Sequence, residues 1–476
     1  MKRTSSALDH SLPARPSKRQ ELSPSEPPPA WSTDNSGPTL ALPSLAPPSR
    51  PPPFQQPLPL LTFSYDNSHT LHFDDSARRY YVDPPPGADL GHGYDRWIRR
   101  PDERGRLDTL LRAYDRAREK AKERPELGNV TAGAVCWRGV MTKILTAPYE
   151  SRDGFALNVM LVNDTLYLEE HLTAAQLQSK NDMPPRQRQM TYYGYAFESW
   201  CTSDTTSPSQ GGWGGDVDTN VQWCQVVKTK LGSTRLVMGG EVDCVRPGQD
   251  TLVELKTSMA IRGLQDEQRF EKKLLKFYLQ SFLLGVPEIV VGFRTPQGHL
   301  TTLQSFKTLH LPRMVRGKHG AWDAQVCLAW GDGVLSWLRA EITRDSGPEA
   351  NGGANGKGVE GNPTPKKRAN VWRATFTAGE GVRLMRLDEE DVKDVEGGED
   401  RVGLLPRWYW ESEVAKDSGE GTRQAETGKS TGESTTATVQ KVAKEAALAR
   451  MVKGVQDVSA QDKPATSGAR GSSWKI

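Results

Sequence analysis

Charged residues interrupt two strand-like segments in the stretch GGEVDCVRPGQDTLVELKTS, residues 239–258. The segments flank PGQD, a sequence typical of a short turn. If residues 247–250 form the loop, the pairs across the hairpin are Arg246–Thr251, Asp243–Glu254 and Glu241–Lys256. Because strand side chains alternate, the two charged pairs project from one face, which we expect to be concave and reachable by solvent. The opposite face is apolar and should pack on a core; it carries Val242, Cys244, Val253 and Leu255.

The carboxylates of Asp243 and Glu254 would destabilise a purely structural hairpin. Opposed β-carbons lie about 5 Å apart, and two ionised carboxylates at that separation repel by roughly 3 kcal/mol at an effective dielectric constant near 20. A divalent cation between them would replace this repulsion by attraction. Oxygen ligands without histidine or thiolate favour Mg²⁺ or Mn²⁺ over zinc. A neighbouring ammonium group, here that of Lys256, can orient a water molecule or stabilise charge on a phosphoryl oxygen.

An Asp followed by Glu-x-Lys on the adjacent strand resembles the D…(D/E)-x-K core of a broad superfamily of metal-dependent nucleases. The three residues here are Asp243, Glu254 and Lys256. From the hairpin alone, the alternative is a group of solvated charges on an exposed sheet face. Motifs elsewhere in the chain favour the nuclease interpretation.

Five motifs, in order along the chain, resemble the DXO-type family of RNA 5′-end decapping nucleases. They are CWRGVMTKILTAPYE (136–150), YYGYAFESW (192–200), GGEVDCV (239–245), VELKTS (253–258) and KFYLQSFLLGVPEIVVGFR (276–294). The family includes nuclear pyrophosphohydrolases that act as partners of the fungal 5′→3′ exoribonuclease. The resemblance spans about residues 60–330 and extends more weakly to WYWESE near residue 410.

The resemblance implies a set of metal ligands. Asp243 and Glu254 would bind the metal directly, with the backbone carbonyl of Leu255 as a further ligand. Glu198 and Glu241 would complete the acidic cluster, partly through water, and would take part in catalysis. The implied cofactor is Mg²⁺ or Mn²⁺.

The resemblance also implies residues that contact the substrate. Lys256 and Gln280 would lie at the scissile phosphate and the nucleophilic water, and Arg138 would hold an RNA phosphate. Glu198 would face the substrate as well as the metal. Taken singly, each of Arg138, Glu198 and Gln280 also fits an ordinary role at the protein surface. Aromatic residues before Glu198 could stack on RNA bases or pack in the core; they are Tyr192, Tyr193, Tyr195 and Phe197.

The elements that position these residues alternate irregularly, which predicts an α+β domain with one large mixed, mostly antiparallel sheet flanked by helices. Strands are expected at 71–82, at 155–171 as two strands around Asn163–Asp164, at 220–245 and at 288–294. Helices are expected at 105–123 and 266–285, the second with Asp266 as N-cap and Gly285 as C-cap. An apolar stripe should pack this second helix on the sheet and leave Lys273, Lys276 and Gln280 together on its flank.

Composition divides the chain into three regions. We expect residues 1–58, rich in proline, and 413–476, rich in polar residues, to be disordered. A single nuclease domain would span 59–412, interrupted by a disordered glycine-rich insertion at 345–370. Within the tail, 438–454 has a helical alternation that fits either a transient helix or one that docks on a partner.

Cysteine usage and hydropathy bear on the protein's surroundings. The five cysteines form no C-x-x-C pair, which favours reduced thiols in an intracellular protein. No apolar run is long enough to cross a membrane, and we expect a soluble protein with no membrane partner. The net charge of +3 is too small to indicate a partner by itself.

Together these features predict a metal-dependent hydrolase of RNA 5′ ends. The family implies release of pyrophosphate, of a whole incomplete cap or of an NAD cap, leaving 5′-monophosphate RNA. It also implies a nuclear location and a role in RNA quality control as a stimulating partner of a nuclear 5′→3′ exoribonuclease. Weak basic signals fit nuclear import or charged linker equally well; they are 365–368, Lys2–Arg3 and Lys18–Arg19. Two alternatives remain: a mainly non-catalytic stabilising partner of the exoribonuclease, and a DNA nuclease with the same metal core.

Overall fold

The computed structural model describes most of the region that carries the motifs. The described residues are 37–124, 128–206, 212–318, 320–346 and 370–417. Most of the expected insertion, the helix-like segment of the tail and the basic import signals lie outside these residues. No helix in the described ranges is both long and apolar enough to cross a membrane. All five cysteines are described, and each is a free, buried thiol.

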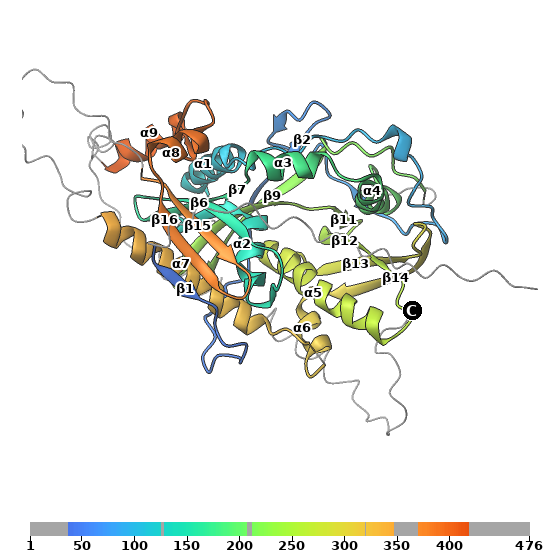
Figure 1. Cartoon of the computed structure of the whole chain (residues 1–476). Coiled ribbons are helices and arrows are strands. Elements are labelled where there is room, and N and C mark those ends of the chain that lie inside the picture. The colour runs from blue at the N-terminus through green and yellow to red at the C-terminus, as the bar shows by residue number, and fades with distance from the viewer. Residues whose placement is uncertain (1–36, 125–127, 207–211, 319, 347–369, 418–476) are drawn as a thin grey trace, which may run out of the picture. The chain divides into compact units, whose positions relative to one another are not determined.

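A ten-stranded mixed sheet, mostly antiparallel, forms the larger part of the fold (Figure 1). Its strands, in spatial order, are β1 (Thr39–Ala41), β16 (Gly381–Arg386), β15 (Trp372–Thr377), β6 (Phe155–Val162), β7 (Thr165–His171), β5 (Ala134–Trp137), β10 (Thr234–Glu241), β9 (Gln222–Leu231), β2 (Leu58–Tyr65) and β3 (Leu71–His72). Only β5 runs parallel to its neighbours β7 and β10. The predicted mixed, mostly antiparallel sheet is therefore confirmed.

A second sheet contains the charged hairpin. Its strands, in spatial order, are β14 (Leu300–Lys307), β13 (Glu288–Arg294), β12 (Thr251–Met259), β11 (Cys244–Arg246), β4 (Tyr80–Tyr81) and β8 (Thr202–Ser203). The short strands β17 (Arg401–Val402) and β18 (Leu405–Pro406) pair with each other. The sequence predicted one sheet, whereas the chain passes from the first sheet to the second between β10 and β11.

Helices cover both faces of the larger sheet (Figure 1). The helices are α1 (Asp108–Glu123), α2 (Arg138–Thr146), α3 (Ala174–Asn181), α4 (Pro185–Trp200), α5 (Leu264–Leu284), α6 (Leu311–Val315), α7 (Ala324–Ser346), α8 (Glu389–Glu396) and α9 (Arg407–Asp417). Short 3-10 turns occur at Tyr94–Arg96, Ala147–Tyr149 and Thr308–His310. Strand alternation separates two cores: Ala134 and Cys136 of β5 pack with α2, α5 and α7, and Val135 packs with α1, α8 and α9.

Several local predictions are confirmed. The turn between β6 and β7 is made by Asn163 and Asp164, both in left-handed conformation with φ of 46° and 59°. Helix α5 ends at Gly285, whose φ is 73°. Its expected N-cap is wrong, because the helix begins at Leu264, after Gly263. Asp266 lies in the first turn, where its carboxylate accepts a hydrogen bond from the Arg262 N–H at 3.2 Å.

The continuous strand expected at 71–82 is also wrong. The segment contains two short strands, β3 and β4, which belong to different sheets. A turn separates them, in which the Asp74 carboxylate accepts hydrogen bonds from the backbone N–H and the hydroxyl of Ser76. This local bonding competes with strand pairing, as is common for Asp and Ser.

The boundaries expected at residues 58 and 412 both place the domain limits too far inward. β1 pairs with β16, and the Gln55 N–H donates to the Lys230 carbonyl at 2.8 Å. The Phe54 ring lies 4.5 Å, between centroids, from that of Phe282 on α5. At the other end, α9 continues to Asp417. The first boundary was predicted from the proline-rich composition. Prolines are nevertheless tolerated at sheet edges and between short paired segments, so this composition does not exclude a folded segment.

Candidate active site

The hairpin of the second sheet has the predicted register. Arg246 pairs with Thr251 and Cys244 pairs with Val253, so the four-residue loop is as expected. Gly248 and Asp250 turn the loop with φ of 74° and 50°. The ladder stops at Cys244, one residue before the position that would place Asp243 opposite Glu254. The predicted carboxylates therefore lie at the open end of the hairpin.

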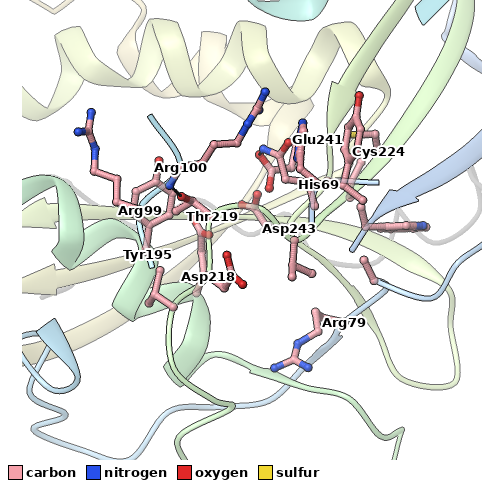
Figure 2. A pocket seen from close by; sticks show the side chains of 18 of the residues that line it. His69, Arg79, Arg99, Arg100, Tyr195, Asp218, Thr219, Cys224, Glu241 and Asp243 are labelled. Atoms are coloured by element: carbon pink, nitrogen blue, oxygen red, sulfur yellow. Dashed lines mark hydrogen bonds between the residues drawn. The ribbon is translucent and has the colours of Figure 1, made fainter. Parts of the chain in front are cut away.

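Glu241 reaches the site from the other sheet, so its predicted pairing with Lys256 is wrong. It is the last residue of β10 and pairs with Cys224 of β9. The crossing between sheets occurs immediately afterwards, where the Val242 N–H donates to the Trp223 carbonyl at 2.9 Å. The Glu241 carboxylate accepts a hydrogen bond from the Gln222 amide at 3.1 Å. Glu241 therefore ends a strand of the first sheet, Asp243 lies in the connection between β10 and β11, and both side chains line the same pocket (Figure 2).

Glu254 is held between two cations. The Lys256 ammonium lies 2.6 Å from Glu254 Oε1 and 3.8 Å from Asp243 Oδ2. Arg138, the first residue of α2, places Nη1 3.3 Å from Glu254 Oε2 and donates to the Glu241 carbonyl at 3.3 Å. Asp243 accepts the Leu255 N–H at 2.6 Å. The Glu254 side chain is only 1% exposed, so this part of the site is more deeply buried than the sequence suggested.

Burial and mutual repulsion make the remaining carboxylates hard to ionise. Burial, reinforced by Asp243, raises the pKa of Glu241 to about 7 and that of Glu198 well above its ordinary value. Burial also raises the pKa of Asp243 to about 6. Burial opposes ionisation of Glu254 too, but Lys256 and Arg138 outweigh it and hold its pKa below the usual range. The cluster thus contains one stabilised carboxylate and three that carry charge at an energetic cost.

The donor set fits a hard divalent cation. Four carboxylates interact electrostatically with one another and with Lys256 and Arg138, and a divalent cation would favour the ionised form of those that burial makes hard to ionise. Within the described ranges, no three His, Cys, Asp or Glu side chains already stand close enough together to hold a metal ion. Lys256 and Arg138 engage Glu254 in this arrangement, and the Leu255 N–H engages Asp243. Asp243, Glu254 and the Leu255 carbonyl would supply oxygens of the kind that Mg²⁺ and Mn²⁺ prefer.

A pocket of about 1210 Å³ opens beside this cluster, and Glu198, Glu241 and Asp243 line it. Several arginines from other segments line the same space (Figure 2). They are Arg78, Arg79, Arg99, Arg100, Arg104, Arg106 and Arg112. The sequence prediction missed them, although the arginine-rich run RWIRRPDERGR at residues 96–106 was a usable signal. Carboxylates beside arginines suit a metal ion that acts on a phosphorylated ligand.

The structure places Gln280 where the sequence predicted, and it shows that most of the aromatic residues before Glu198 pack in the core. Gln280 is half-buried on the flank of α5, beside the exposed Lys273 and Lys276, as predicted. It makes no hydrogen bond with the cluster among the described contacts, so its assignment to the scissile phosphate stays a prediction. Among the aromatic residues, three are buried and pack in the core: Tyr192, Tyr193 and Phe197. Only Tyr195 of that set lines the pocket.

The fold and this cluster of Asp, Glu and Lys define a PD-(D/E)XK-type metal-dependent nuclease. The chain belongs to the RAI1-like PD-(D/E)XK nuclease family, whose model matches residues 55–410. The decapping nuclease RAI1 of Mycosarcoma maydis is 40% identical over 448 residues, which cover 75% of this chain and 87% of that protein. The decapping and exoribonuclease protein of Xenopus laevis is 36% identical over 304 residues, covering 60% and 75%.

Solved structures share the fold at lower identity. Scheffersomyces stipitis Rai1, solved with (3′-NADP)⁺ and a calcium ion, is 23% identical with a TM-score of 0.63, covering 80% of this chain and 98% of that one. Candida albicans Rai1, solved with pU5 and Mn²⁺, is 23% identical with a TM-score of 0.62, covering 79% and 99%. The family and fold predicted from the motifs are confirmed.

Proposed function

We propose that this chain is a divalent-metal-dependent hydrolase of RNA 5′ ends that removes pyrophosphate, incomplete caps or NAD caps and leaves 5′-monophosphate RNA. One observation carries the proposal: Asp243, Glu254 and Lys256 meet beside a large pocket lined by both carboxylates and arginines. Relatives named decapping nucleases, and neighbours solved with RNA or a dinucleotide, support RNA 5′ ends as the substrate class.

The side chains have separable roles in this reaction. Asp243, Glu254 and the Leu255 carbonyl would hold Mg²⁺ or Mn²⁺, which when bound would supply activation of water and compensation of charge on the phosphate. The Lys256 ammonium, kept protonated by Glu254 and Asp243, donates to a non-bridging phosphate oxygen. Arg138 orients the Glu254 carboxylate, and the Leu255 N–H fixes that of Asp243. The pocket arginines hold the remaining phosphates of the 5′ end.

The test incubates purified protein with Mg²⁺ or Mn²⁺ and RNA bearing a 5′-triphosphate, an unmethylated cap or an NAD cap. Released pyrophosphate, cap dinucleotide or NAD, together with 5′-monophosphate RNA, would support the proposal. Asp243→Asn provides the inactive control. DNA of the same sequence tests the alternative substrate, and degradation of DNA ends as fast as RNA ends would favour a DNA nuclease. Absence of product from all three RNAs would refute the enzymatic function.

We further propose that the protein resides in the nucleus and binds a nuclear 5′→3′ exoribonuclease. The resemblance of its motifs to the fungal branch of the family, together with relatives named RAI1, supports this assignment. Co-purification with the exoribonuclease, and fluorescence microscopy of the tagged full-length chain, test the two parts separately. A variant with Asp243→Asn and Glu254→Gln that stimulates the exoribonuclease without releasing 5′-end products would separate the roles of enzyme and partner.

A further inference from the structure

Trp137 and Arg138 connect the acidic cluster to a network of ion pairs and hydrogen bonds around Arg106. Trp137 is the last residue of β5, and its indole Nε1 donates to the Arg106 carbonyl at 2.8 Å. Arg138 follows directly, begins α2 and contacts Glu254 at 3.3 Å. Any rotation of the Trp137 backbone would therefore displace the guanidinium group that orients Glu254.

The two glycines before Glu241 leave the space that the side chains of Trp137 and Arg138 occupy. Gly239 lies opposite Trp137 in the parallel pairing of β10 with β5. A β-carbon at Gly239 would lie 2.7 Å from a ring carbon of Trp137, and one at Gly240 would lie 3.2 Å from Arg138 Nε. The Gly-Gly pair therefore lets the indole and the guanidinium pack directly on the strand that ends in Glu241.

Arg106 is fixed in turn by ion pairs and hydrogen bonds, the most buried of them to Glu169. Its Nη1 lies 3.0 Å from Glu169 Oε1 and donates to the Val395 carbonyl at 2.8 Å. Its Nη2 lies 3.2 Å from Glu399 Oε1. The Glu169 side chain is 1% exposed, and Val395 lies in the last turn of α8, where unpaired carbonyls accept cations. With a further hydrogen bond from Nη2 to the Glu396 carbonyl at 3.4 Å, the carbonyl that receives the Trp137 indole belongs to a residue whose side chain has four partners.

We propose that Arg106 and Trp137 are positioning residues: the anchored Arg106 carbonyl holds the Trp137 indole, and Trp137 sets Arg138 against Glu254. This inference rests on the proposed function and deepens it. The network also couples the C-terminal segment containing α8 to catalysis, although that segment does not contribute to the acidic cluster. Arg106 and Trp137 also line the pocket, so direct contact with the substrate is the competing role.

The test uses Trp137→Phe, which keeps a ring on Gly239 and removes the indole donor. We expect kcat to fall about tenfold with KM within twofold, because Arg138 acts on the chemical step. Trp322→Phe is the matched control, since Trp322 is buried, its indole donates to the Glu271 backbone carbonyl at 3.0 Å, and it is not among the residues that line the pocket. We expect kcat of Trp322→Phe to stay within twofold of wild type, even with a comparable fall in Tm.

A double-mutant cycle with Arg138→Ala tests whether Trp137 affects catalysis through Arg138. If Trp137 acts through Arg138, Trp137→Phe should change kcat less than twofold in the Arg138→Ala background. An undiminished tenfold effect there would overturn the proposal. A raised KM with unchanged kcat in Trp137→Phe would indicate contact with the substrate and would also overturn the proposal. The same holds if Trp322→Phe loses as much kcat as Trp137→Phe.

A second measurement separates this inference from the proposed function. In Arg106→Lys, the NMR signal of the Trp137 indole N–H, assigned by its absence from Trp137→Phe, should shift. That shift is expected whether or not RNA 5′ ends are the substrate. An unchanged indole signal would refute the anchoring by Arg106, whereas a wild-type enzyme without RNA products would refute only the proposed function.

Discussion

Replacing Asp243 by asparagine should stabilise the metal-free protein, whereas replacing Glu254 by glutamine should destabilise it. The asparagine side chain would keep an oxygen for the Leu255 N–H and would remove a charge that burial disfavours. The Asp243 pKa rises from 3.8 to about 6. At about 1.4 kcal/mol per pKa unit, the ionised carboxylate lowers stability at pH 7 by about 3 kcal/mol.

The stability that Asp243→Asn gains over the wild type should increase with pH. A carboxyl whose pKa is higher in the folded state binds its proton more tightly there, so wild-type stability falls as pH rises from about 4 to about 6. Asp243→Asn lacks this titration. Its advantage should therefore be close to zero below pH 4 and reach about 3 kcal/mol by pH 7.

Glu254 differs because two cations depend on it. Lys256 and Arg138 lie 2.6 Å and 3.3 Å from its carboxylate. Glu254→Gln would leave both cations with less compensation in a buried site, and breaking such a pair typically costs about 3 kcal/mol or more. The two substitutions remove the same formal charge, yet they should change stability in opposite directions.

Urea denaturation in EDTA, at pH 4 and pH 7, measures both effects, and added Mn²⁺ tests the metal site. Mn²⁺ should stabilise the wild type and have little effect on either variant. Both variants should lose hydrolysis by orders of magnitude. The electrostatic reasoning would be refuted if Asp243→Asn lowered the free energy of unfolding while Glu254→Gln left it unchanged. A double variant that releases 5′-end products at the wild-type rate would disprove the assignment of this site.

Three further predictions concern the framework. Deleting residues 1–57 should lower Tm in a thermal melt because β1 and its pairing with β16 are lost; an unchanged Tm would show that these residues add no stability to the fold. Hydrogen bonds from Arg246 lower the Glu288 pKa from 4.5 to about 2, and Glu288→Gln should lower stability at pH 7 by about 2 kcal/mol, less than the full shift would give because Arg246 is partly exposed to solvent. This stability is present above pH 4.5 and is lost as pH falls toward 2, so the variant should show a flatter acid titration. Gly239→Ala should cost about 1–3 kcal/mol by overpacking against Trp137 and should reduce hydrolysis, and wild-type activity in this variant would show that the ring can shift freely.

Much of the local structure could be predicted from the sequence. The hairpin register followed from a turn sequence and from strand alternation, both of which depend on residues a few positions apart. Helix α5 and its C-terminal Gly285 followed from apolar periodicity and from the left-handed conformation that glycine adopts easily. The hairpin by its spacing indicated Asp243 and Glu254, and the resemblance of the motifs to the DXO-type family added Glu198 and Glu241 to the expected acidic cluster.

Only the tertiary structure decided how these parts meet. Glu241 and Asp243 are two positions apart in sequence, yet Glu241 ends a strand of the first sheet, where β10 pairs with β5 and β9, and Asp243 lies in the connection to the second sheet. Glu198 and Arg138 reach the cluster from helices far away in the chain, and burial among them sets which carboxylates stay ionised. Strand pairing and burial depend on contacts between distant residues, whereas alternation and turn chemistry are local. Local patterns in the sequence were therefore enough to predict the hairpin and to propose the ligands, whereas long-range packing sets the contacts of these residues, their charge states and the arginine-lined pocket beside them.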